Sequence, residues 1–352
     1  MSTRQLPVAP AEAPTGPAGW PRRNLATCGL LLFALAVACA PLLPFVNSYV
    51  VALMVRMLLL IALGQAWNII AGIGGQMSLG HGVFFGIGAY ATGLLFNDLS
   101  VTPWIGTWLA ALIAALVALV IGAITFRLRG IYFALATVVI SLAFEKLSRY
   151  YAAFTGGDTG LALQFRGTAP AAMQWREPQA FLWITLLVVI AYFLITRWLL
   201  RGDFGLSLQA VRDDEEAASA SGVDIYRTKV LAFLLSAVMT SVAGTLHVQF
   251  YLSIDPGTAF GLAQAIQIQL PALIGGLATA GGPIIGGVIM ILLNEGTNIA
   301  SSALDLPGVD ILAYGLVLLL IVFKAPAGIL GTLEARRHRR RGTGVSTSRG
   351  GH

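Results

Sequence analysis

Long apolar runs separated by short polar segments make up most of the chain. Several runs reach about 18–20 residues, the length that an α-helix needs to cross about 30 Å of hydrocarbon. Membrane-spanning β-strands would instead alternate apolar and polar residues over about ten positions. The pattern therefore predicts an all-α polytopic membrane protein with about 8–10 transmembrane helices. The candidate spans lie at 27–46, 49–70, 76–96, 104–126, 131–150, 180–200, 229–251, 262–278, 283–300 and 310–324.

A charged segment, 201–229, separates two of these spans. Only 11% of the residues are charged, so this concentration of charges is unusual. A segment this polar between two membrane spans must lie in water. Within it, the acidic run Asp213–Glu216 is followed by small residues and then by Gly222. This order predicts a short amphipathic helix that ends at the glycine, a suitable docking element for a soluble partner.

The basic residues predict the orientation of the chain in the membrane. Lysine and arginine mark the cytoplasmic side of a membrane protein, and most of the 22 lie inside if the N-terminus is cytoplasmic. This puts 201–229 and both termini in the cytoplasm. We expect a disordered cytoplasmic tail at 1–24, a transmembrane domain at 25–331 with 201–229 as a cytoplasmic loop, and a basic cytoplasmic tail at 332–352. The net charge of +6 thus reflects topology and gives no reason to expect a nucleic-acid partner.

Eight glycines lie between Gly72 and Gly93, among the polar residues Gln76, Ser78 and His81. Free backbone groups are costly in hydrocarbon, so a broken helix here must line a cavity or be buried in protein. Tight packing through small residues explains the glycines equally well. His81 is more readily explained as a hydrogen-bonded structural histidine than as a ligand. A second glycine-rich segment, 275–287, loosely resembles the first, as an internal repeat would.

Other polar residues within the spans are candidates for transport or for structural bonds. We favour structural pairing for the charges, which are Arg56, Glu145, Lys146 and Glu295. Gln264 and Gln267 share a helix face, where they either contact a polar substrate or bond a neighbouring helix. The candidate pathway residues are Gln76, Ser78, His81, Gly86, Tyr90, Gln264 and Gln267.

Catalytic and cofactor motifs are missing from the sequence. It contains no G-x-x-x-x-G-K-[ST], no H-E-x-x-H and no G-x-S-x-G. Cys28 and Cys39 lack metal-ligand spacing and are treated as small apolar residues. We therefore expect a protein that is not an enzyme and that binds no cofactor or metal of its own.

Several motifs together resemble one family of transport proteins. Glu216, Ala217, Ala218 and Gly222 give E-A-A-x-x-x-G, as in the coupling loop of ABC importer permeases, although the following I-x-L-P is absent. With the segments 76–90, 128–137, 155–160, 204–218, 275–277 and 325–331, the chain resembles the M-type permeases of branched-chain amino acid ABC importers. The resemblance covers about residues 60–331, nearly all of the membrane portion.

The resemblance implies an assembly in a bacterial inner membrane. A periplasmic or extracellular binding protein delivers substrate, an H-type permease completes the path, and two cytoplasmic ATPases bind ATP and magnesium. The implied substrates are leucine, isoleucine and valine, with urea, short amides or other amino acids as alternatives. An ion-coupled secondary carrier stays open as a different class. The implied coupling residues are Phe204, Gly205, Arg212, Asp213, Asp214, Glu215, Glu216, Ala217, Ala218 and Gly222.

Overall fold

The computed structural model describes residues 20–43, 46–304, 315–316, 319 and 328–329. Most of this part is helical and only two short strands are present in it, which confirms the predicted all-α class. The first helices are α1 (Trp20–Cys39), α2 (Ser48–Asn68), α3 (His81–Leu99), α4 (Pro103–Thr125) and α5 (Ile131–Tyr150). The later helices are α7 (Gln179–Leu199), α8 (Asp203–Asp213), α9 (Glu215–Ala220), α10 (Ile225–Tyr251), α11 (Pro256–Phe260), α12 (Leu262–Gly275) and α13 (Gly282–Leu304).

Short elements connect these helices. The strands β1 (Leu161–Ala162) and β2 (Ser253–Ile254) are two residues long and pair in antiparallel fashion. The others are η1 (Ala40–Leu42), the π-helical turn η2 (Ile69–Ile73), α6 (Ala152–Thr155), η3 (Gly157–Thr159) and η4 (Pro170–Ala172).

Six helices of the described residues are long and apolar enough to cross a membrane. They are Ser48–Ile73, Pro103–Thr125, Ile131–Tyr150, Gln179–Leu199, Ile225–Tyr251 and Gly282–Ser302, and each matches a predicted span. The spans predicted at 27–46 and 262–278 fall on shorter apolar helices, Thr27–Leu42 and Leu262–Gly275. The span at 310–324 and the tail at 332–352 lie mostly or wholly outside the described residues. Helix α1 begins at Trp20, within the predicted tail 1–24.

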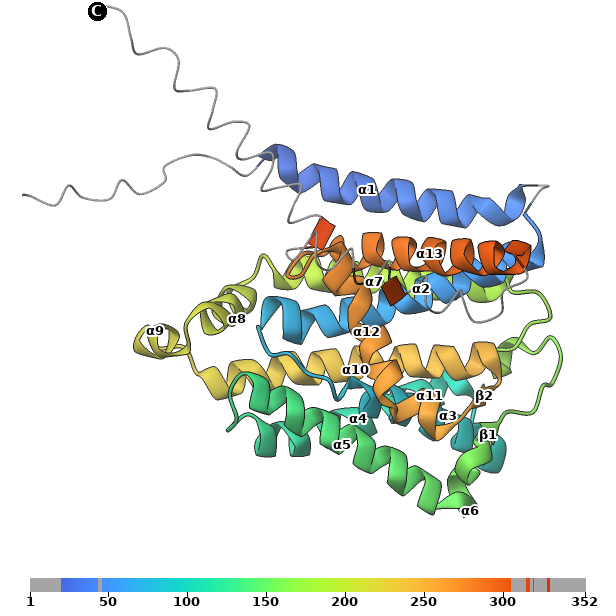
Figure 1. Cartoon of the computed structure of the whole chain (residues 1–352), viewed down its shortest axis with the longest axis horizontal. Helices are drawn as coiled ribbons and strands as arrows, with labels where there is room; N and C mark the ends of the chain where they lie inside the picture. The colour runs from blue at the N-terminus through green and yellow to red at the C-terminus, as the bar shows by residue number, and fades with distance from the viewer. Residues whose placement is uncertain (1–19, 44–45, 305–314, 317–318, 320–327, 330–352) are drawn as a thin grey trace, which may run out of the picture.

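The helices form an elongated bundle with two distinct ends (Figure 1). Helices α8 and α9 lie at one end, while β1, β2 and α6 lie at the other. We call these the α8–α9 end and the β1–β2 end. The 27-residue helix α10 runs between them and packs against α2, α3 and α4. The charged segment therefore lies at one end of the bundle, as its polarity requires.

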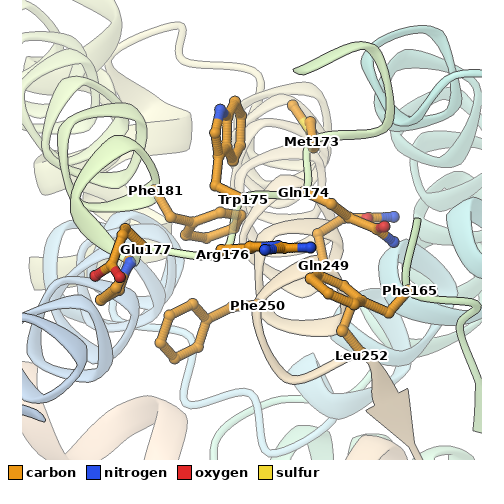
Figure 2. A pocket seen from close by; sticks show the side chains of 11 residues that line it. Phe165, Met173, Gln174, Trp175, Arg176, Glu177, Phe181, Gln249, Phe250 and Leu252 are labelled. Carbon is orange, nitrogen blue, oxygen red and sulfur yellow. The ribbon is translucent and has the colours of Figure 1, made fainter. Parts of the chain in front are cut away.

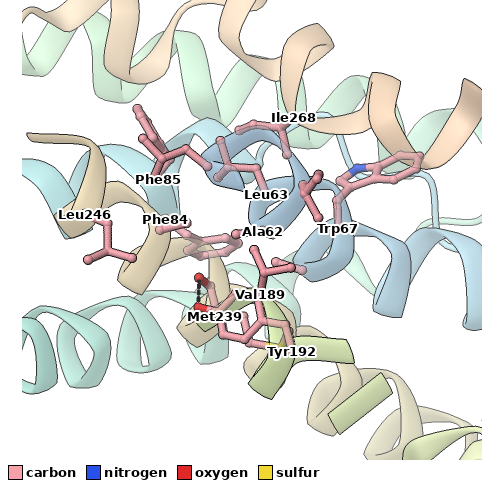
Figure 3. Packing of buried hydrophobic residues seen from close by; sticks show 14 of the residues in the cluster. Ala62, Leu63, Trp67, Phe84, Phe85, Val189, Tyr192, Met239, Leu246 and Ile268 are labelled. Atoms are coloured by element: carbon pink, nitrogen blue, oxygen red, sulfur yellow. Dashed lines mark hydrogen bonds between the residues drawn. The ribbon is translucent and has the colours of Figure 1, made fainter. Parts of the chain in front are cut away.

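Aromatic and aliphatic side chains fill the centre of the bundle (Figure 3). Trp67, Phe84 and Phe85 are fully buried there. Glycines bring α3 and α10 together, because a Cβ at Gly88 would collide with the Ser241 carbonyl. Such close backbone approach is typical of helix packing in membranes.

Two helices begin inside the bundle instead of at its ends. Residues 74–80 precede α3 without regular helix, and 252–261 form only β2 and α11 before α12 begins. Both breaks bond to α5: Leu79 N donates to Thr137 Oγ1 (3.1 Å), and Ser141 Oγ donates to the Phe260 carbonyl (2.8 Å). The break predicted between Gly72 and Gly93 is thus present, together with the close glycine packing that was its alternative.

Candidate functional site

The charged segment folds into two helices that meet at a sharp corner (Figure 1). Asp214, between α8 and α9, is extended, and its carboxylate accepts hydrogen bonds from the backbone of Glu216 (2.9 Å) and Ala217 (3.1 Å). Gly222 follows α9 with φ +87°, which favours glycine. The helix predicted from the acidic run therefore exists and ends near the expected glycine, but a second helix precedes it.

All ten predicted coupling residues belong to this pair of helices or to its turns. Phe204, Gly205, Arg212 and Asp213 lie on α8, Glu215 to Ala218 lie on α9, Asp214 joins the two, and Gly222 follows them. We call residues 203–222 the coupling unit. On the outer side of α9, Glu216, Ala217 and Ser219 are exposed. The unit therefore presents small and acidic side chains at the end of the bundle.

Glu215 fastens the coupling unit to two other parts of the chain. Lys229 Nζ, on α10, lies 2.5 Å from Glu215 Oε1, and the Lys229 side chain is 2% exposed. Arg129 Nε, just before α5, lies 3.7 Å from Glu215 Oε2. Neither partner was predicted, although a lysine at the start of an apolar span is a signal that a carboxylate lies nearby.

Arg212 fastens the unit to the end of α2. Its Nη1 donates to the Gly72 carbonyl at 3.4 Å. Its aliphatic stem packs against Gly75, which has φ +69° and no room for a Cβ. One turn earlier on α8, Leu208 packs in the same way against Gly74. Movement of α8 would therefore press directly on the glycine-rich segment before α3.

Asn68 joins the two glycine-rich segments to each other. Its Nδ2 donates to the Thr279 carbonyl (2.9 Å), and its Oδ1 accepts from the Ala278 backbone (3.0 Å). Gly72 lies against the same backbone, where a Cβ would be 2.6 Å from Ala278 N. The segments that echo each other in sequence thus lie side by side. Asn68 was missed, and its only signal was an amide, three residues after that of Gln65, inside an apolar run.

His81 is a buried cross-link between α3, α10 and α2. Its Nδ1 lies 3.0 Å from Ser78 Oγ and its Nε2 2.7 Å from Ser236 Oγ. Ser236 uses its own proton to reach the Ala66 carbonyl (2.7 Å), so Nε2 must carry the histidine proton. A neutral imidazole with both nitrogens bonded is the structural histidine that the sequence favoured.

Gly86 and Tyr90 hold the second helix break in place. The Tyr90 and Phe260 rings stack with centroids 5.8 Å apart, and Tyr90 Oη donates to the Ile254 carbonyl (3.4 Å). A Cβ at Gly86 would collide with the Phe260 ring. These residues come together around α11, whereas Ser78 and His81 belong to the first break.

The remaining pathway candidates differ in exposure. Gln76 and Gln264 are both 8% exposed. Gln267, one turn along α12, is exposed, so the predicted polar face is half buried and half open. The structure therefore gives the two glutamines different surroundings despite their shared side of the helix.

Glu145 and Glu295, two of the four charged residues predicted within the spans, have polar partners, as expected for structural pairing. Arg149 bonds Glu145 at 2.9 Å, one turn away on α5, and Asp158 at 2.5 Å. Tyr49 Oη donates to Glu295 at 2.5 Å. The pairing predicted for Glu145 and Glu295 is confirmed by these contacts.

Asp255 begins α11 and accepts hydrogen bonds from Thr258 N (2.9 Å) and Thr258 Oγ1 (2.6 Å). Partial burial would raise the pKa of this carboxyl, but the bonds to Thr258 outweigh it and hold the pKa below its ordinary value. The aspartate therefore stays charged and caps the short helix.

A cavity of about 160 Å³ lies at the β1–β2 end, between the loop before α7 and the end of α10 (Figure 2). Phe165, Trp175, Phe181 and Phe250 give it aromatic walls, and Arg176 contributes a cation. None of the residues predicted from the sequence line it. Among the described residues, no group of three or more His, Cys, Asp or Glu is suited to hold a metal ion.

The sequence of the chain is similar to those of known membrane transport proteins. Residues 48–324 match the family described as branched-chain amino acid transport system / permease component. The LivM permease of Escherichia coli K12 is 27% identical over 294 residues, covering 77% of this chain and 67% of that protein. The LivH permease of Salmonella typhimurium is 27% identical over 301 residues, covering 79% and 92%.

A more distant relative is the probable LivM permease of Methanocaldococcus jannaschii, 24% identical over 301 residues, with 76% of this chain and 84% of that protein covered. No solved structure matches the chain. The relatives are permeases of a transport system and not enzymes. The chain belongs to the family of permease components of branched-chain amino acid transport systems.

Proposed function

We propose that this chain is an M-type permease subunit of an ATP-driven importer that carries leucine, isoleucine and valine into the cytoplasm. Its partners are an H-type permease, two ATPases that bind ATP and magnesium, and a substrate-binding protein. The complex lies in a bacterial inner membrane with the coupling unit on the cytoplasmic side. The observation that carries the proposal is the coupling unit itself, a projecting helix pair tied to three parts of the bundle.

The form of α9 suits docking into a groove of an ATPase. Its exposed Ala217, Ser219 and Ala220 are small and permit close approach. Its N-terminal turn carries Glu215 and Glu216, which complement the helix dipole and keep the short helix formed. A partner that closes on ATP would then move α9 as a rigid piece.

The attachments of the coupling unit give this movement a route into the bundle. Glu215 contacts Arg129 at the start of α5, and α5 bonds both helix breaks through Thr137 and Ser141. Arg212 and Asn68 connect α8 to both glycine-rich segments. ATP binding in another subunit can bias the bundle between two access states through these contacts, without chemistry in this chain.

The test is purification of the tagged chain from its own membranes, followed by uptake in liposomes. We expect an ATP-hydrolysing subunit to copurify, and leucine uptake to require ATP and the binding protein. The variant Ala217→Trp should block docking, while Tyr226→Trp, an exposed change just outside the unit, should not. Uptake driven by an ion gradient without any ATPase would contradict the proposal and support a secondary carrier. Competition by urea or amides, with none by leucine, would reassign the substrate.

A further inference from the structure

The loop before α7, which covers the cavity at the β1–β2 end, is held in one place. Leu163 N donates to the Leu252 carbonyl (2.8 Å), which joins the loop to the end of α10. Inside the loop, Gln174 Oε1 accepts from Arg166 N (2.7 Å), and its Nε2 donates to the Gln164 carbonyl (3.0 Å). The Gln174 side chain that makes these bonds is itself buried. The cavity is therefore preformed, as ligand sites usually are.

The cavity has an open mouth and a closed floor (Figure 2). Phe165 is 53% exposed, and Arg176 and Glu177 are also exposed, so these three residues line the mouth. Phe181 and Gln249 are each 3% exposed and line the floor. The volume is about 160 Å³. Since a cavity of about 150 Å³ accepts a benzene molecule, a branched aliphatic side chain fits between these aromatic walls.

Gln249 contributes an unpaired amide to the floor of the cavity. Both its Nε2 and its Oε1 are buried and have no hydrogen-bond partner among the described residues. Buried amides are normally bonded, because an unpaired polar group has lost its bonds to water without replacement. A ligand that carries both a donor and an acceptor would restore these bonds. The amide therefore indicates a ligand with a polar part as well as an apolar one.

Arg176 and Glu177 place opposite charges at the mouth. No ion pair among the described residues involves Arg176, and its guanidinium extends toward Gln249 in Figure 2. Glu177 accepts a hydrogen bond from Ser48 (2.9 Å), which uses one of its two carboxylate oxygens. A planar guanidinium binds a carboxylate through two parallel bonds, and a carboxylate accepts from an ammonium group. The mouth therefore suits a ligand that carries both charges.

We propose that this cavity binds a free aliphatic amino acid, with its side chain against the aromatic walls and its charged groups between Arg176, Glu177 and Gln249. The guanidinium and the amide N–H hold the carboxylate, while Glu177 and the amide oxygen accept from the ammonium group. That this ligand is the transported amino acid rests on the proposed function. Under that function the β1–β2 end faces outward, so the cavity is a site where substrate first meets this chain.

Thermal unfolding tests ligand binding without any transport assay. The full chain is purified from its own membranes with the subunits that accompany it, without the binding protein, and is heated with increasing leucine. We expect leucine to raise the Tm of the wild type. The apparent Kd for leucine should rise about tenfold or more in Arg176→Gln, which loses a charge-assisted bond, and in Gln249→Met.

The two variants also separate binding from folding. Gln249→Met removes an unpaired buried amide and keeps a side chain of similar size, so without leucine it should be at least as stable as the wild type. Arg166→Gln removes a cation from the same loop but outside the cavity, and its Kd should stay within about twofold of wild type. Wild-type Kd in both Arg176→Gln and Gln249→Met, or no effect of leucine on the wild type, would overturn the proposal.

Cysteine labelling tests which parts of the ligand are recognised. In a Cys28→Ser, Cys39→Ser background, Phe165→Cys is treated with a methanethiosulfonate reagent, and the labelled band of this chain is measured. We expect leucine to slow the reaction about threefold or more, and to slow it more than 4-methylpentanoate, which lacks the ammonium group, or isopentylamine, which lacks the carboxylate. Tyr150→Cys, exposed at the same end of the bundle, is the control and should react at one rate throughout.

The labelling result also distinguishes this site from the proposed function. Equal rates with and without leucine at Phe165→Cys, or equal protection by all three compounds, would overturn the amino acid site. Absence of ATP-driven leucine uptake by the wild type, with protection intact, would refute the proposed function and leave the site standing.

Discussion

Lys229 Nζ lies 2.5 Å from Glu215 Oε1, with the lysine side chain only 2% exposed. This ion pair joins the first turn of α9 to the start of α10, the longest helix in the part of the chain that the structure describes. A buried charge is tolerated only with a partner, so the pair fixes where the coupling unit sits. Because of this contact, we expect α9 and the start of α10 to move together.

Removal of one partner of this pair should be severely destabilising. Glu215→Gln leaves the Lys229 ammonium buried without a counter-charge, which costs about 3–5 kcal/mol. Lys229→Met with Glu215→Gln should recover a large part of the loss, because no buried charge remains. Thermal unfolding of the purified complex measures both. Arg227→Met, an exposed change two residues away, serves as the control, and equal stability of the single and double variants would contradict the prediction.

Arg212 should be needed for coupling more than for folding. Arg212→Ala removes the stem that packs on Gly75 and the donor to the Gly72 carbonyl. We expect the complex to assemble and hydrolyse ATP, while leucine uptake per ATP falls about tenfold. Arg212→Lys keeps most of the stem and should retain intermediate uptake. Parallel loss of uptake and ATPase activity would indicate a general structural role instead.

Asn68 should couple the two glycine-rich segments. In Asn68→Ala the backbone N–H of Ala278 loses its acceptor, which costs about 1–3 kcal/mol. Asn68→Asp keeps that acceptor but should be the more severe change, because position 68 is fully buried and the new carboxylate would face the Thr279 carbonyl without a donor. A double-mutant cycle of Asn68→Ala with Arg212→Ala, measured as leucine uptake per ATP hydrolysed, tests whether both residues act in the same coupling route. If the effects of the two substitutions are additive, the residues act independently of each other.

The helices could be predicted from sequence because their information is local. The apolar runs gave the matched spans, and the acidic residues, small residues and Gly222 gave α9 and its end. The bonds that organise the site are not local. Asn68 and Thr279 are 211 residues apart, and Ser141 and Phe260 are 119 apart. Only the tertiary fold brings such partners together, so the sequence showed the polar residues without their contacts.

The four-residue spacing of Thr137 and Ser141 shows that the sequence reveals part of such a contact. The spacing puts both hydroxyls on one face of α5, but nothing local says that this face meets two helix breaks. Thr137 and Ser141 were therefore recognisable as part of the site only after α3 and α11 were placed beside α5.

Thr137 and Ser141 should hold the two helix breaks in register. Ser141→Ala leaves the Phe260 carbonyl without its donor, and Thr137→Val leaves the Leu79 N–H without its acceptor. Each change should cost about 1–3 kcal/mol in the free energy of unfolding. Because both breaks then loosen, we expect the double variant to raise basal ATPase activity in the absence of the binding protein and to reduce its stimulation. Ser302→Ala, which removes only a bond within α13, is the matched control. Unchanged stimulation in a destabilised double variant would show that the bonds to α5 support the fold but take no part in switching.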